Sequence, residues 1–112
     1  TIKDAAIIRL GEAGASRICL WHCDNITDRG ICSLYGAHTL DINNCFRVSE
    51  NGIKSLSGAH TISLCCKKLS YESIRPLVVR AHVINICECG QMTISMLTKL
   101  RSINTKCIIR IK

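Results

Sequence analysis

Cysteine and histidine are the residues of this chain with the most distinctive chemistry. The 112 residues include nine cysteines and four histidines, which could form disulfides, metal sites or a pH-sensitive cluster. Three histidines, His38, His60 and His82, recur every 22 residues, in "GAHTLDINNC", "GAHTISLCCK" and "RAHVINICEC". They belong to an internal repeat, so the repeat must decide where the reactive side chains lie.

Each repeat combines two patterns. A segment such as "Leu40-Asp41-Ile42" alternates apolar and polar residues and predicts a short strand. The segment after the next cysteine has apolar residues three or four apart, which predicts a short helix. The third repeat is one residue short after its strand and recovers the register before Ala81. Repeats should stack, with parallel strands about 4.8 Å apart.

Short polar residues and glycines should bound the helices. Thr27/Asp28 and Ser49/Glu50 stand at the expected helix starts, where their oxygens can accept hydrogen bonds from free backbone N–H groups. Glycines follow three of the expected helices, where a left-handed residue often ends a helix. These glycines are Gly14, Gly36 and Gly58.

The pattern resembles the leucine-rich repeat, L-x-x-L-x-L-x-x-N/C, with alanine in the first leucine place. The cysteine followed by "ITD..I..L" looks like the cysteine-containing subclass found in F-box/leucine-rich-repeat proteins. "HTLDINNC" is also similar to the "VHTLDLSGC" repeats encoded by large DNA viruses of amoebae. The resemblance implies an α/β fold, a right-handed horseshoe solenoid with one parallel strand and one short helix per repeat.

The repeat boundaries predict a single domain over residues 1–112. It should consist of a partial repeat 1–15, repeats 16–37, 38–59, 60–81 and 82–103, and a last strand at about 104–112. The sequence opens in mid-repeat and shows no polar capping repeat, which solenoids need for solubility. We therefore expect a longer chain, or an assembly that covers both ends.

The repeat accounts for most of the cysteines. Those after each strand and two others should be small buried side chains: Cys23, Cys45, Cys66, Cys89, Cys32 and Cys107. Strand parity points Cys19, Cys65 and Cys87 outward, with Cys65 and Cys87 as neighbours and Glu88 close by. A soft metal could bind such thiolates, but the C-x-x-C spacing of a zinc site is missing. We predict reduced thiols, no metal, no cofactor and an intracellular location, in the cytoplasm or, for a viral protein, in the virion.

The repeated histidines should stack as a ladder one strand spacing apart. Such a ladder could bind a metal or sense pH. We favour a repeated structural contact instead, such as a hydrogen bond to neighbouring backbone at the strand entrance.

Outward strand positions should form a concave, mostly uncharged surface. Trp21 is the only tryptophan and the best anchor for a partner, unless it packs against an adjacent repeat or a missing segment. The predicted binding residues are Arg17, Trp21, Thr39, Asp41, Asn43, Thr61, Ser63 and Asn85.

Positive charge gathers in the second half of the chain. Residues 1–66 carry six basic and six acidic side chains, and residues 67–112 carry nine and two, so the net charge of +7 arises there. The basic residues are Lys67, Lys68, Arg75, Arg80, Lys99, Arg101, Lys106, Arg110 and Lys112. They predict an acidic partner, or simply a solvated face. Nucleic acid is less favoured, because no aromatic residues are interleaved with the basic ones.

The sequence favours binding over catalysis. It has no G-x-S-x-G, P-loop or H-E-x-x-H motif and no apolar run long enough for a membrane span. We predict a non-enzymatic protein-interaction or scaffold element whose partners contact the concave face and the solenoid ends. The resemblance to viral repeats implies a role in a virion or in interaction with a host. One alternative is the substrate-recognition region of an F-box-type ubiquitin-ligase adaptor, which requires an F-box before residue 1. The other is nucleic-acid binding through the basic repeats, which salt would weaken.

Overall fold

The computed structural model of the chain describes residues 3–45, 47–65, 69–87 and 92–111. Within these residues the fold is α/β, and helices alternate with strands along the chain. The elements are α1 (Asp4–Glu12), β1 (Arg17–Trp21), α2 (Asp28–Cys32), β2 (Thr39–Asn43), α3 (Glu50–Lys54), β3 (Thr61–Cys65), α4 (Tyr71–Val78), β4 (Val83–Cys87), α5 (Ile94–Ile103) and β5 (Ile108–Ile111).

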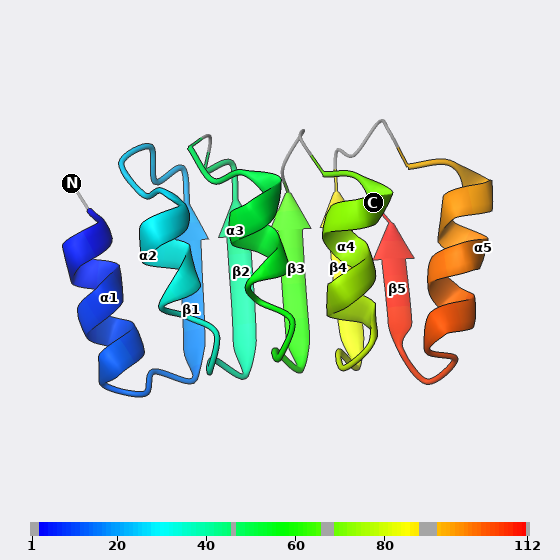
Figure 1. Ribbon diagram of the computed structural model, residues 1–112, viewed down its shortest axis with the longest axis horizontal. Coiled ribbons are helices and arrows are strands. Elements are labelled where there is room, and N and C mark those ends of the chain that lie inside the picture. Colours follow the sequence, from blue (N-terminus) through cyan, green and yellow to red (C-terminus); the bar gives the residue numbers. More distant parts are fainter. Residues whose placement is uncertain (1–2, 46, 66–68, 88–91, 112) are drawn as a thin grey trace.

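The five strands form one parallel sheet in chain order, β1-β2-β3-β4-β5 (Figure 1). Arg17 pairs with Thr39, Thr39 with Thr61, and Thr61 with Val83, so each of these steps is 22 residues. The sequence period is therefore the register of the sheet. The last step, from Val83 to Ile108, is 25 residues, and the greater length of α5 accounts for most of the increase.

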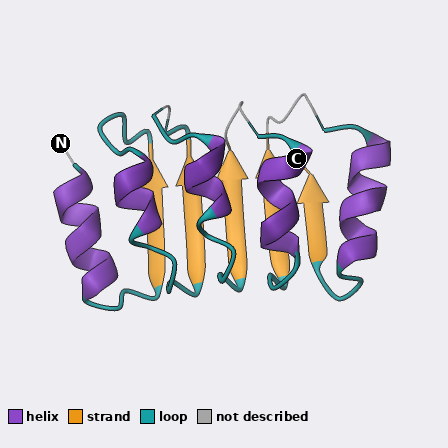
Figure 2. Ribbon diagram, in the orientation of Figure 1, coloured by secondary structure: helices purple, strands orange, loops and turns teal. Residues whose placement is uncertain are grey.

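The helices form one layer along one face of the sheet (Figure 2). The molecule is longest across the strands, and its extents are 38 × 24 × 20 Å. We call the sheet surface that points away from the helices the open face. A connection of a dozen or more residues is needed between parallel neighbours, and each short helix with its turns supplies it.

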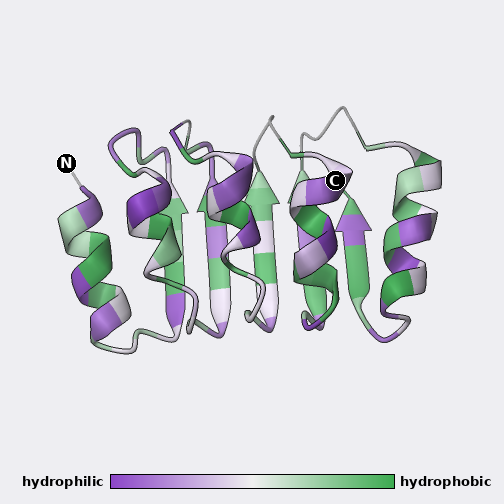
Figure 3. Ribbon diagram, viewed as in Figure 1, coloured by the Kyte–Doolittle hydropathy of each residue, from purple (hydrophilic) through white to green (hydrophobic). Residues whose placement is uncertain are grey.

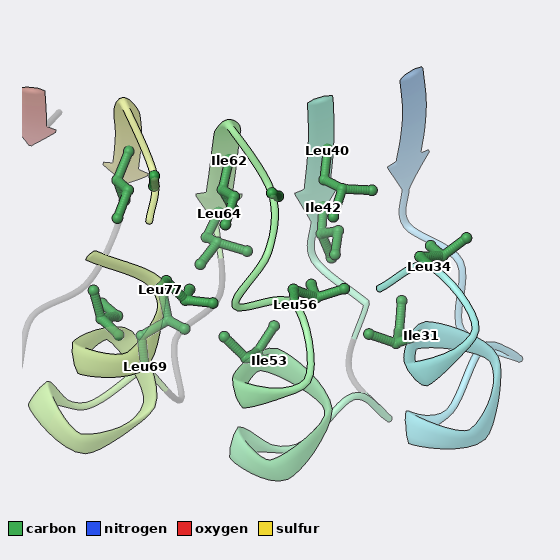
Figure 4. Packing of buried hydrophobic residues seen from close by; sticks show 14 of the residues in the cluster. Ile31, Leu34, Leu40, Ile42, Ile53, Leu56, Ile62, Leu64, Leu69 and Leu77 are labelled. Carbon is green, nitrogen blue, oxygen red and sulfur yellow. The ribbon is translucent and has the colours of Figure 1, made fainter. Parts of the chain in front are cut away.

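Inward strand residues and one side of each helix form a continuous aliphatic core. Leu40, Ile42, Ile62 and Leu64 point from β2 and β3 toward the helical layer (Figure 4), where they pack with residues such as Leu56. The alternation is clearest in β2, where hydrophobic and hydrophilic residues follow one another (Figure 3). We call each strand, together with the helix that follows it, a rung. Each rung buries its apolar residues against those of the next rung, so the core depends on the stacking of rungs.

Aspartates link the start of one helix to the start of the next. Thr27 and Ser49 are the N-caps of α2 and α3, as predicted, and each accepts from a backbone N–H at 3.3 Å. Asp4 accepts from the Thr27 N–H at 2.8 Å and from its hydroxyl at 2.5 Å. Asp28 accepts from the N–H of Ser49 at 2.7 Å and from its hydroxyl. Burial raises the pKa of Asp4, but the bonds from Thr27 outweigh it and lower the pKa below its usual value.

The third residue of α2 and the third residue of α3 must leave room for this link. A Cβ on Gly30 would collide with the Asp4 carboxylate, and one on Gly52 with the carboxylate of Asp28. Helix α3 begins with a glutamate, not an aspartate, and the next helix, α4, has Ser73 at its third position. The Ser73 hydroxyl donates to the Ser70 carbonyl at 2.9 Å, and the two residues form a capping box. Glycine is therefore found where the preceding helix begins with aspartate.

Left-handed backbone lies largely outside the positions we predicted. Gly14 has φ of 76°, as expected, but Gly36 and Gly58 do not have positive φ, so that prediction is wrong for both. The chain after α2 and α3 instead winds through tight turns, such as the bond from Ala37 N–H to the Leu34 carbonyl at 3.0 Å. Left-handed conformations occur at two strand exits, at His22 (φ 53°) and Asn44 (φ 51°).

The aspartate–glycine link yields a stability prediction. Gly52→Ala should lower the free energy of unfolding by about 1–3 kcal/mol, because the new methyl displaces the Asp28 carboxylate from Ser49. Helix propensity alone would favour alanine. In an Asp28→Ala background the same change should cost less, and a double-mutant cycle from urea melts measures the coupling.

Gly36→Ala is the matched control. Its Cβ would meet nothing within 4 Å and its φ is not positive, so stability should stay the same or rise by about 0.4–1 kcal/mol. Equal losses for Gly52→Ala and Gly36→Ala would contradict the steric link.

Candidate functional site on the open face of the sheet

The constant register sorts the outward side chains of the open face into rows across the strands. The first row is Arg17, Thr39, Thr61, Val83 and Ile108, and the second is Cys19, Asp41, Ser63, Asn85 and Arg110. The third is Trp21, Asn43, Cys65 and Cys87. All eight predicted binding residues occupy outward positions in these rows, and they are half-buried or exposed.

Trp21 is held in place by a carboxylate. Its indole Nε1 donates to Asp41 Oδ2 at 3.2 Å, and the Cys19 thiol donates to the same oxygen at 3.7 Å. The indole remains 58% exposed. Desolvation and the Asp41 carboxylate raise the pKa of the Cys19 thiol above its usual value. The result is an oriented aromatic surface beside a negative charge.

A pocket of about 190 Å³ lies between the second and third rows. The side chains of Trp21, Asp41, Asn43, Ser63 and Asn85 line it, together with Leu64, Ile86 and two cysteines. Asn85 Nδ2 donates to Ser63 Oγ at 3.1 Å, which orients an amide at the edge of the pocket. Such a pocket offers hydrogen-bond donors and acceptors from Asp41, Asn43, Ser63 and Asn85.

The two pocket cysteines differ from our prediction of free thiols. Cys65 and Cys87 are directly paired in register, as expected, but their sulfurs are joined in a disulfide with a Cα–Cα distance of 4.8 Å. Parallel neighbours on one face lie within disulfide range, which spans about 4.4–6.8 Å between Cα atoms. The link closes one side of the pocket.

Other cysteines follow the predictions in part. Cys45 and Cys107 are buried, as expected. Cys23 is half-buried and packs against the core, so its predicted burial is only partial. Cys32, the last residue of α2, is exposed, so its predicted burial is wrong. Cys66, Cys89 and Glu88 lie outside the described residues. Among the described residues, no three histidine, cysteine or acidic side chains are placed to hold a metal ion.

The three repeated histidines stack at the strand entrances. The His38 and His60 rings are 4.5 Å apart between centroids, and those of His60 and His82 are 4.1 Å apart, with interplanar angles of 13° and 12°. We expected bonds from these rings to neighbouring backbone. Instead, Nδ1 of His38 and of His60 lies 2.8 Å from the hydroxyl of the following threonine. Desolvation, and then the two flanking histidines, lower the pKa of His60.

The described basic residues do not form one patch with the open face. Arg75, Lys99 and Arg101 belong to α4 and α5, and Arg80 and Lys106 lie in turns. Arg110 alone among the described basic residues of this half lies on an outward strand position, in the second row. Arg101 donates to the Ile109 carbonyl at 3.2 Å and so covers part of the β5 edge. Lys67, Lys68 and Lys112 lie outside the described residues.

Both ends of the sheet present apolar surface, where we also expected partner contacts. At the β1 end, a pocket of about 430 Å³ is lined by residues of α1, β1 and the connection between them, which include Leu10, Ala15 and Ile18. At the other end, Ile108 is 50% exposed and Ile111 is 43% exposed. These surfaces are distinct from the open-face pocket.

Two features of the site had only partial signals in the sequence. The bond from Trp21 to Asp41 is diagonal, from one row to the next, and long side chains bridge such positions in sheets. The two cysteines were recognised as neighbours, but not as a wall of the pocket. Their identical repeat position was the available signal.

The histidine stack should make stability depend on pH. Because the folded chain lowers the pKa of His60, the unfolded chain binds protons first as pH falls. The contribution of neutral His60 to the free energy of unfolding is fully present above the ordinary histidine pKa. It is lost as the pH falls through the pKa of His60 in the folded chain. The melting temperature should therefore fall between about pH 7.5 and about pH 5.

Replacing the central ring tests the origin of this loss. His60→Gln should reduce the fall in melting temperature, whereas His22→Gln, outside the stack, should leave it unchanged. A wild-type melting temperature that is flat over this range would contradict the prediction.

Comparison with known proteins adds no family to these observations. The sequence matches no family model and no curated protein. Among the described residues, no helix is long and apolar enough to cross a membrane. In its described residues the chain is an α/β protein in which helices alternate with the five strands of a parallel sheet, and the open face of this sheet carries a polar pocket.

Proposed function

We propose that this chain is a leucine-rich-repeat solenoid that serves as a protein-interaction or scaffold element, and that a partner protein binds its open face. One observation carries the proposal. The open face groups variable polar side chains around a single exposed tryptophan and a pocket, whereas the inward positions repeat nearly the same aliphatic residues.

The solenoid assignment is supported by the way the rungs stack. Three successive steps of 22 residues, one strand and one helix per rung, and a single helical layer are the features such a fold requires. The aspartates that join successive helix starts are a further contact between neighbouring rungs.

Binding by the open face is supported by its chemistry. Tryptophan is enriched at interaction hot spots, because a large apolar ring can be buried while its N–H keeps a partner. Trp21 is already oriented by Asp41, so little side-chain freedom is lost when a partner covers it. Asn43, Ser63 and Asn85 supply polar groups beside it. A peptide or loop with an apolar residue and backbone groups would suit this surface.

An assembly role agrees with the surfaces at both ends of the sheet. The apolar pocket at β1 and the exposed isoleucines of β5 would be covered if further repeats or subunits stacked there. The resemblance to viral repeats favours such an assembly element, in a virion or an infected cell.

A comparative pull-down tests the proposed surface. Immobilised wild-type chain is compared with Trp21→Ala and Asn43→Ala, and recovered proteins are quantified by mass spectrometry. A genuine partner should fall by about tenfold or more with Trp21→Ala, as expected when a hot-spot aromatic is lost. Asn43→Ala, which removes a pocket amide, should give a smaller loss.

Tyr35→Ala provides the matched control, because Tyr35 is 71% exposed and lies after α2, away from the open face. Its partner recovery should equal that of the wild type. If Tyr35→Ala removes the same proteins, or if Trp21→Ala removes none, the open face is not the binding surface.

A further inference from the structure

We infer that Cys65 and Cys87 form a reversible dithiol–disulfide site on the open face, one that exchanges with small-molecule thiols and disulfides. The inference is independent of the proposed partner binding. It assigns to this chain a redox modification site within the pocket.

The two cysteines occupy matching positions on neighbouring strands. Cys65 and Cys87 are the last residues of β3 and β4, they are directly opposite in register, and both side chains line the pocket. Their Cα atoms are 4.8 Å apart, which suits a disulfide without movement of either strand. The pocket gives a small reagent a route from solvent to the sulfurs.

Strands β3 and β4 are held together by contacts other than the disulfide. Strands β3 and β4 pair along all five residues, from Thr61 with Val83 to Cys65 with Cys87. Their inward residues Ile62, Leu64 and Ile84 are buried in the core. Hydrogen bonds and apolar packing therefore hold the two sulfurs near each other in the reduced chain too, so the bond can form and break within the folded state.

The two cysteines differ in their exposure to solvent. Cys65 is only 8% exposed, whereas Cys87 is half-buried. Thiol–disulfide exchange requires a thiolate that can reach the sulfur of the reagent. Cys87 is therefore the residue that reacts with a reagent from solvent, and Cys65 resolves the mixed disulfide from inside.

The oxidant is a low-molecular-weight disulfide, RSSR, such as oxidised glutathione. The Cys87 thiolate attacks one sulfur of RSSR; the S–S bond breaks, and RS⁻ leaves and takes up a proton as RSH. Cys65 then loses its proton to solvent and attacks the Cys87 sulfur, which releases the second RSH. In total, two thiols and one RSSR give one protein disulfide and two RSH, and two electrons pass to the reagent.

The test is a redox titration of the full chain. Protein reduced with dithiothreitol is equilibrated without oxygen in buffers of different ratios of reduced to oxidised glutathione. Acid quenching, alkylation and intact mass spectrometry then count free thiols. We expect two thiols to disappear together as the ratio falls and to return when it is raised, with fragment spectra placing the link between Cys65 and Cys87. Circular dichroism should show that both forms are folded.

Single substitutions identify the roles. Cys65→Ser should accumulate one glutathione on Cys87, and Cys87→Ser should form an adduct at Cys65 several-fold more slowly. Cys66→Ser and Cys89→Ser, next to the pair in sequence, are matched controls that should keep the paired loss of two thiols.

Four results would overturn the inference: both thiols stay free at every ratio, the disulfide resists reduction in the folded chain, the reduced chain is unfolded, or Cys66→Ser or Cys89→Ser abolishes the paired loss. If Cys65→Ser does not fold, the wild-type titration and the Cys87→Ser variant, which changes the more exposed of the two cysteines, decide whether the pair exchanges reversibly.

Discussion

The hydrogen-bond register of the parallel sheet is the constraint on which the rest of this structure depends. Equivalent positions of neighbouring rungs must lie opposite one another in the sheet, and three successive steps of 22 residues meet this requirement. Once the register is constant, parity sends equivalent residues of every strand to the same side. The aliphatic core, the histidine stack and the rows of the open face are consequences of that single condition.

This constraint explains how much of the fold could be predicted from sequence. Periodicity located the strands, and with them the outward positions of Trp21 and Asp41 and the neighbouring positions of Cys65 and Cys87. The N-caps Thr27 and Ser49 were also predictable, since a hydroxyl before a helical pattern has one dominant local role. These features depend only on the repeat period and on near neighbours in the chain.

Features that depend on contacts between rungs were harder to predict. Gly36 looked like a helix-ending residue, but tight turns after α2 replaced the left-handed conformation. Gly52 is required by Asp28, a residue of the previous rung, and no pattern within one repeat reveals that collision. The bond between Trp21 and Asp41 likewise joins adjacent strands diagonally. Side-chain partners across rungs follow from three-dimensional geometry, whereas periodicity reports only which face each residue occupies.

The same division separates the candidate site from the fold that supports it. Inward residues are constrained by two neighbouring rungs, so a change there disturbs packing on both sides. Outward residues such as Asn43 and Cys87 lie beside their row neighbours and are only half-buried, so a change there can leave the register intact. When two adjacent rungs carry cysteine at the same outward position, as Cys65 and Cys87 do, the two side chains lie next to each other. The chemistry of the open face can therefore vary rung by rung on a core that stays constant, and this independence makes a repeated sheet suitable for recognition.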